Sequence, residues 1–168
     1  GRFTVAEVVE FMEQIGSALA YGHARGLMHG NLRLSNVVIG KDSVARVSGL
    51  GTPKRIRQDL RLMATRSGTT SIPLYAPPEV LIDERTADAR SDIYNLAAVG
   101  YHMLTGVPPQ SGADMLQAEF RAALQDLLPP RALVPEVPAY LDRFLRKALQ
   151  PEPSDRYEDM GAFLAELQ

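Results

Sequence analysis

The sequence predicts a mostly helical α+β domain, built as a bundle of helices around a buried central helix, with one or two short β-hairpins. Three observations support this fold class. Residues 5–23 carry apolar side chains at helical spacing, and residues 92–104 are almost uniformly apolar. The last third of the chain is divided by prolines into short amphipathic segments. A length of 168 residues favours a single domain with its own core.

The first helix is expected over residues 5–23. Thr4 and Glu7 have the spacing of a capping box before it, and Gly26 follows a basic residue as a plausible stop. Residues 37–39 and 44–47, separated by Gly-Lys-Asp-Ser, predict a small hairpin. Residues 49–78 show no sustained period, and a loop of that length inside a compact domain is usually functional or mobile.

Four further helices are expected after Pro78. The stretch 92–104 should be buried on all sides, because almost every residue in it is apolar. Amphipathic helices are expected at 113–128, 139–149 and 157–167. Prolines lie after the first two of these segments and should end them.

Bulk composition excludes several classes of function. A net charge of −2 gives no general attraction to nucleic acid or to an acidic membrane. The absence of cysteine excludes disulfides and thiolate metal sites. No apolar run approaches the ~20 residues of a membrane span, and the N-terminus lacks the apolar core of a signal peptide. A cytoplasmic location, or one on the cytoplasmic face of a larger membrane protein, is expected.

Five short stretches occur in an order typical of one protein family. They are HGNLRLSN at 29–36, GLG at 49–51, YAPPE at 75–79, SDIYNL at 91–96 and PEPSDRY at 151–157. They resemble the H-R-D-L-x-x-x-N loop, the D-F-G and A-P-E elements, the start of the buried central helix and the D-P-x-x-R-[YF] element of protein kinases. Together they resemble the C-terminal lobe of a bacterial serine/threonine kinase. The resemblance implies one domain over residues 1–168, an activation-segment-like loop at 49–79, and an N-terminal lobe outside this chain.

The residues that would carry catalysis depart from the family pattern. The resemblance places the catalytic Asp at Asn31, whose amide is not a useful base near neutral pH. It places the metal-binding Asp of D-F-G at Gly49, which has no side chain. Asn36 matches the second metal ligand but offers only one neutral carbonyl to an ion that prefers carboxylates. Arg33 stands where a lysine is usual and keeps its charge without its compact geometry.

Other positions keep residues to which the resemblance assigns a structural role. Asp92 corresponds to a buried Asp that accepts hydrogen bonds from the catalytic-loop backbone, and Glu79 and Arg156 correspond to a buried ion pair. His29 is expected to pack into the core rather than to react. We therefore expect the kinase-like shape to survive where the catalytic residues do not.

Simpler interpretations exist for several of these residues. Asn31 could be a tolerated surface residue, and Asn36 could bond the loop backbone instead of a metal ion. His23 is expected to pack into the core, and His102, on an apolar helix, is expected to be a buried or half-buried packing residue. No cofactor is expected, and ATP with Mg²⁺ would bind only residually, with Val38 under the adenine ring and Asn36 as a weak ligand.

Two surfaces could bind partners. The face that an N-terminal lobe would cover is expected to include Val37, Val38 and Leu50, and an exposed apolar patch of this kind commonly marks an interaction site. Its occupant could be a protein partner, a second copy of the chain or another part of the same protein.

The second surface is a basic stretch within the long loop. Its cations are Lys54, Arg55, Arg57, Arg61 and Arg66, offset only by Asp59. It is either a solvated mobile loop or a docking strip for an acidic or phosphorylated protein. The hydroxyl residues Thr65, Ser67, Thr69, Thr70 and Ser71 could be phosphorylated by another kinase. Gly30 replaces the family's arginine that would clamp such a phosphate, which argues against the usual ordering response.

Three functions follow from the resemblance. The first is a catalytically inactive kinase-like domain, a pseudokinase, that acts as a scaffold or an allosteric regulator. The second is a pseudokinase that still binds nucleotide as a conformational switch. The third is a weakly active serine/threonine kinase when joined to an N-terminal lobe, for which Asp42 and Asp59 are the only nearby acids and neither matches the expected position.

Overall fold

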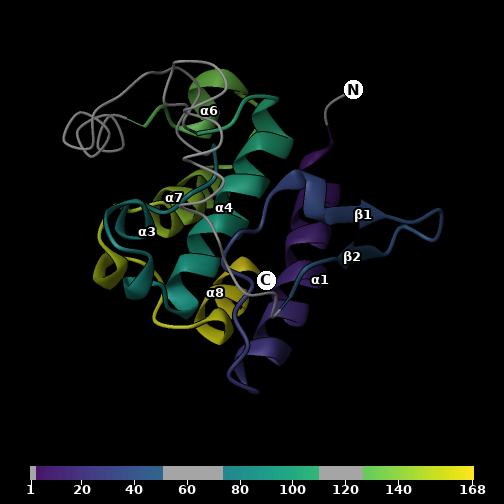
Figure 1. Ribbon diagram of the computed structural model, residues 1–168. Helices are drawn as coiled ribbons and strands as arrows, with labels where there is room; N and C mark the ends of the chain where they lie inside the picture. Colours follow the sequence, from purple (N-terminus) through teal and green to yellow (C-terminus); the bar gives the residue numbers. More distant parts are fainter. Residues whose placement is uncertain (1–2, 51–73, 110–126) are drawn as a thin grey trace, which may run out of the picture.

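The fold is a helical bundle with one two-stranded sheet (Figure 1), described by a computed structural model for residues 3–50, 74–109 and 127–168. The helices of these ranges are α1 (Val5–His23), α3 (Pro78–Ile82), α4 (Ala89–Thr105), α6 (Pro130–Leu133), α7 (Ala139–Ala148) and α8 (Met160–Leu167). Single 3₁₀ turns lie at Leu34–Asn36, Glu84–Thr86 and Pro153–Asp155. The mostly helical fold class predicted from the sequence is confirmed.

Helix α4 is the centre of the bundle. Every residue from Ser91 to Thr105 is buried except His102, because α1, α6, α7 and α8 all pack against it (Figure 1). The helix begins at Ala89, three residues before the predicted start, because the Asp88 side chain caps it by accepting a hydrogen bond from Arg90 N at 2.8 Å. Gly106 ends it with a φ of 79°.

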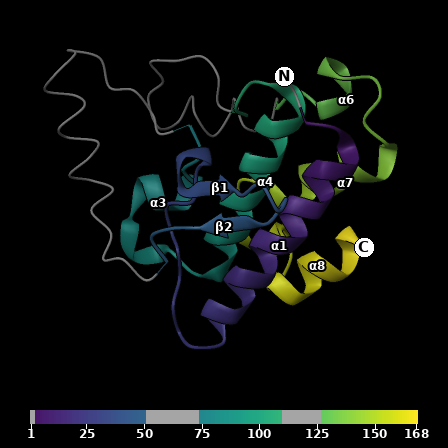
Figure 2. The same cartoon turned by 90° about the vertical axis from the view of Figure 1, so that its right-hand side faces the viewer.

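Helix α1 has the predicted bounds and the predicted cap. Thr4 Oγ1 accepts from Glu7 N at 3.3 Å, while the Glu7 carboxylate accepts from Thr4 N at 2.7 Å. The hairpin of β1 (Val37–Ile39) and β2 (Ala45–Val47) lies across α1 (Figure 2), with Val37 paired to Val47. The second strand begins one residue later than predicted. The turn before it is closed by Ser43 at a φ of 58° and by the bond from Gly40 N to Val44 O.

The end of the chain departs from the prediction. The helix expected over 157–167 begins only at Met160, because Asp159 is its N-cap and accepts from Ala162 N at 2.7 Å. Tyr157 is instead buried in the preceding loop, with its ring 5.2 Å from that of Phe144. Of the helix expected over 113–128, residues 113–126 lie outside the described residues.

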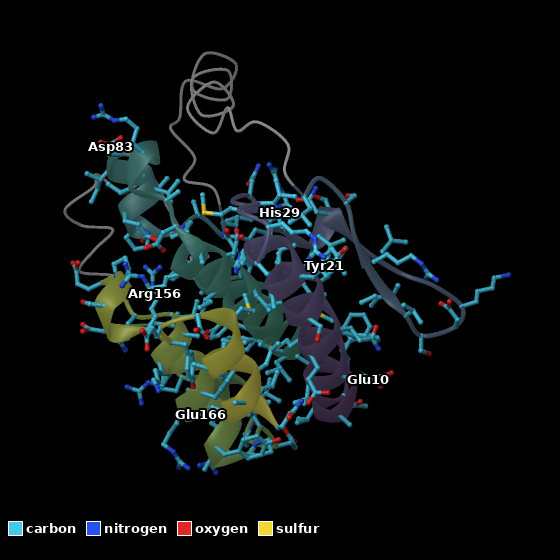
Figure 3. The ribbon with its side chains drawn as sticks, turned by 90° about the horizontal axis from the view of Figure 1, so that it is seen from below. Glu10, Tyr21, His29, Asp83, Arg156 and Glu166 are labelled. Atoms are coloured by element: carbon cyan, nitrogen blue, oxygen red, sulfur yellow. The ribbon has the colours of Figure 1, made fainter. Side chains whose placement is uncertain are left out.

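The Arg156 guanidinium joins four segments of the fold (Figure 3). Its side chain is 0% exposed, and it forms two charge-assisted bonds to Glu79 at 2.8 and 2.9 Å. Its remaining N–H groups donate to the carbonyls of Arg90, Gln150 and Pro151 at 2.8–3.1 Å. All five N–H donors of the guanidinium therefore have an acceptor, which a buried arginine requires.

We predict that Arg156→Ala lowers the free energy of unfolding by about 3–5 kcal/mol, because it leaves the Glu79 carboxylate without its partner. Urea unfolding followed by circular dichroism measures the change. Arg131→Ala, at an exposed position on α6, is the control and should change stability by less than about 0.5 kcal/mol. The double variant Glu79→Leu/Arg156→Met should lose less than Arg156→Ala, and equal stability of Arg156→Ala and wild type would contradict the assigned role.

Candidate functional site

The loop of residues 29–36 is tied to the central helix by the carboxylate of Asp92. This side chain is 0% exposed, and its oxygens accept from His29 N at 2.8 Å and from Gly30 N. The ring of His23, at the end of α1, makes a third bond to it, with Nε2 2.8 Å from Asp92 Oδ2. A buried carboxylate with three hydrogen bonds from one loop and one helix end fixes the position of that loop.

His29 is buried and is bonded through both ring nitrogens. It is 3% exposed, with Nε2 2.9 Å from the carbonyl of Ser48 and Nδ1 accepting from Asn31 N at 3.3 Å (Figure 3). An accepting Nδ1 requires the tautomer with its proton on Nε2, which then donates to Ser48. The ring therefore links the loop to the chain after β2, consistent with a structural role.

The loop carries its functional candidates on a turn that begins with a glycine in left-handed conformation. Gly30 has a φ of 66°, and the half-buried side chains of Asn31 and Arg33 follow it. At the other end of the hairpin, Gly49 has a φ of 88° and is exposed. A backbone hydrogen bond joins the start and the end of the hairpin, with Asn36 O accepting from Ser48 N at 2.9 Å.

The side-chain oxygen of Asn36 does not bond the loop backbone, contrary to the simpler of the two interpretations of this residue. Its backbone N–H donates to Arg33 O at 2.9 Å, but its buried Oδ1 has no hydrogen-bond partner within the described residues. The expectation that this side chain bonds the loop backbone is therefore wrong for its oxygen. This free oxygen is a single neutral acceptor atom.

The residues at these positions do not fit a magnesium ion. Mg²⁺ prefers hard oxygen ligands that include carboxylates. Asn31 and Asn36 supply only neutral amide oxygens, and Gly49 has no side chain. Residues 3–50, 74–109 and 127–168 hold no group of three or more His, Asp or Glu side chains that could bind a metal ion.

A polar cluster beside the loop was missed by sequence reasoning. The hydroxyl of Tyr75 lies 2.6 Å from Nδ1 of His102, and Asn95 Nδ2 donates to the carbonyl of Tyr75. His102, expected to be a buried or half-buried packing residue, is thus half-buried and hydrogen-bonded. The signal was present in the sequence: Asp92, Asn95 and His102 stand at helical spacing, so the polar residues of an apolar helix share one face.

Burial shifts the proton affinities of this cluster. It raises the pKa of Tyr75 above its usual value, although the charge of Arg33 acts in the opposite direction. Burial lowers the pKa of His102 below 6.5, because the charged ring is poorly solvated there. Both residues therefore favour their neutral forms near neutral pH.

The expected apolar face is only partly exposed. Val38 is 59% exposed, but Val37 and Leu50 are partly buried and pack against the core, with Leu50 against Gly22. The expectation of an exposed patch is therefore wrong for Val37 and Leu50. The basic stretch (Lys54, Arg55, Arg57, Arg61, Arg66) and the hydroxyl residues from Thr65 to Ser71 lie outside the described residues.

None of the helices in the described ranges is both long and apolar enough to cross a membrane.

Comparison with known proteins identifies related sequences. Residues 1–164 match the family of the protein kinase domain. The serine/threonine-protein kinase PknB of Mycobacterium tuberculosis is 28% identical over 167 residues, which cover 99% of this chain and 26% of that protein. The probable serine/threonine-protein kinase PknB of Bifidobacterium longum is also 28% identical, over 99% of this chain and 24% of its own length. The serine/threonine-protein kinase Pkn1 of Myxococcus xanthus is 31% identical over 96% of this chain and 24% of its own length. The chain spans about a quarter of the length of these relatives.

We predict that Asp92→Asn loosens the loop, because the amide presents a donor where the carboxylate accepts from two backbone N–H groups. The expected cost is about 1–3 kcal/mol of stability. Amide hydrogen exchange should accelerate at His29 and Gly30, and this local readout separates the clamp from a general loss of packing. Asp155→Asn, at an exposed position, is the matched control and should leave both amides unchanged.

We predict that His102 makes stability depend on pH. Its pKa is lower in the folded state than in the unfolded state, so the unfolded state binds more protons near pH 6. This contribution is fully present above the unfolded pKa of about 6.5 and is lost as the pH falls below it. The free energy of unfolding, measured with denaturant across that pH range, should change less with pH in His102→Gln than in the wild type. A His102 titration midpoint above 6.5 by NMR would contradict the prediction.

Proposed function

Because the chain belongs to the protein kinase family, we propose that it is a pseudokinase domain, which keeps the kinase-like shape and binds protein partners without transferring phosphate. The observation that carries the proposal is the contrast between the held backbone of the loop and the residues at the two catalytic positions of the family. Asp92 holds the backbone of His29 and Gly30 in place, while the two positions that need a carboxylate are Asn31 and Gly49.

The loss of the base and the loss of the metal ligand act on different parts of phosphoryl transfer. Transfer depends on positioning and on neutralising charge, with an Asp accepting the proton of the substrate hydroxyl. An amide at Asn31 cannot accept that proton usefully near neutral pH. Without a carboxylate at Gly49, a metal ion bridging the phosphates would lack its main protein ligand. Either loss alone would be severe, and together they favour inactivity.

Residual nucleotide binding is the second candidate function. Two observations favour it: Asn36 Oδ1 has no partner within the described residues, and Val38 is exposed where an adenine ring would rest in the family. The exposed Val38 side chain is equally suited to a partner protein or a second copy of the chain. In either case the occupant would cover apolar surface, which favours association.

A weakly active kinase is the third candidate, and the described acids give it little support. Asp42 is the only acid of the hairpin, and it pairs with Arg46 at 2.7 Å. This pairing lowers the pKa of Asp42 to about 2, so its carboxylate is a weak base. Asp59 lies outside the described residues. The relatives are named as serine/threonine kinases, so activity is tested directly below.

We predict that ATP does not shift the melting temperature, with or without Mg²⁺, in the full-length product of the gene that encodes this chain. A ligand that binds only the folded state must raise the melting temperature. No phosphate should appear on the protein or on a generic serine/threonine peptide. A shift without transfer would replace the first candidate by the nucleotide switch, and transfer that is lost in Asn31→Ala would establish an active kinase.

The variants Asn31→Asp and Gly49→Asp, made together, provide the matched gain of function. Asp is among the residues that tolerate the left-handed region occupied by Gly49. The pair should introduce a Mg²⁺-dependent shift with ATP if the missing carboxylates are the reason for inactivity. Lys41→Asp, an exposed change at the hairpin tip, adds acidic charge elsewhere and should introduce none.

A further inference from the structure

The outer face of α7 carries cations without acids among them. The helix buries Leu141, Phe144, Leu145 and Ala148 against the bundle, and its exposed side carries Tyr140, Arg143, Arg146 and Lys147. Arg143 and Lys147 stand four residues apart, and Arg143 and Arg146 three apart, so like charges are neighbours on one face. Such pairs repel each other and destabilise a helix, whereas alternating signs would stabilise it.

A hollow of about 450 Å³ lies on this face. It is lined by Arg143, Arg146, Lys147, Gln150 and Asp155. Three cations and one carboxylate give it a charge of +2, in a chain whose net charge is −2. The hollow is lined by α7, by Gln150 just after it and by Asp155 of the 3₁₀ turn Pro153–Asp155, and it includes no residue of the loop of residues 29–36.

The three cations of the hollow differ in whether a carboxylate pairs with them. Lys147 pairs with Glu166 at 3.3 Å and lies 4.1 Å above the ring centre of Tyr157, so its position is fixed. Neither Arg143 nor Arg146 has a carboxylate partner in the described ranges. The dipole of α7 favours cations in its last turn, which accounts for Arg146 and Lys147 but not for Arg143, one turn earlier.

We propose that this hollow binds an acidic segment of a partner protein. Two free guanidiniums suit carboxylates, with which they form paired hydrogen bonds. Asp155 and Gln150 add acceptors that suit the N–H groups of a peptide backbone. The exposed ring of Tyr140 lies on the same helix and extends the surface. The proposal does not depend on whether the catalytic loop is active.

The test is fluorescence anisotropy of a labelled decaglutamate peptide with the full-length protein, in the absence of nucleotide. Arg143→Glu/Arg146→Glu should weaken binding by about tenfold or more, and added salt should weaken wild-type binding, since exposed charges are screened. The control Arg25→Glu/Lys41→Glu changes the net charge equally at exposed positions after α1 and between β1 and β2, outside the hollow, and should bind as wild type. If charge reversal prevents folding, Arg143→Gln/Arg146→Gln replaces it.

Several outcomes would overturn the proposal. Equal losses in the two double variants would show that only net charge matters. No binding at low salt would exclude an acidic peptide as the ligand. Inorganic phosphate that displaces the peptide at equal concentration would point to a small-anion site, and preferential binding to anionic phosphatidylserine vesicles through Arg143 and Arg146 would point to a membrane surface. None of these results bears on phosphoryl transfer.

Discussion

The carboxylate of Asp92 is the constraint on which the rest of the structure depends. It sits on the central helix with 0% exposure, and it is the point where the end of α1, the loop of residues 29–36 and α4 meet. Removing a carboxylate from water is costly, so the surrounding N–H groups must be held where they can bond it. Through His29 the same network reaches Ser48 and the chain after the hairpin. The buried carboxylate of Asp92 therefore requires the observed backbone conformation of the loop.

The second buried ion, Arg156, constrains the part of the bundle around the start of α4. Its bonds to Glu79 and to three carbonyls tie α3, the start of α4 and the end of α7 together. Ser91 adds a bond to Glu79 at 2.8 Å, one residue before Asp92. The two networks therefore begin on adjacent residues of one helix. This arrangement ties the hydrogen bonds of the loop and of the Glu79–Arg156 pair to one turn of the central helix.

Much of the fold could be predicted, because its signals are local. The capping box of Thr4 and Glu7, the apolar run of α4 and the turn of the hairpin each specify an element from neighbouring residues alone. The start of α8 was misplaced because Tyr157 continues the helical spacing, although its ring is buried in a loop. The exposure of Val37 and Leu50 was predicted wrongly, because the family resemblance placed them on a face without regard to how they pack against the core of this chain. The bonds of His23, Asn95 and His102 depend on residues distant in sequence, and a single sequence does not reveal such pairs.

The left-handed turn at Gly30 has a consequence for the residues that this position can carry. A residue with a Cβ atom would hold the observed φ of 66° at a cost of roughly 1–2 kcal/mol, whereas glycine adopts it freely. An arginine here, as in the family pattern, must be held in that conformation by its surroundings. Glycine leaves the loop relaxed at this turn, and arginine in its place would be opposed by the backbone itself. The conformation of the loop therefore restricts which residues position 30 can carry without a loss of stability.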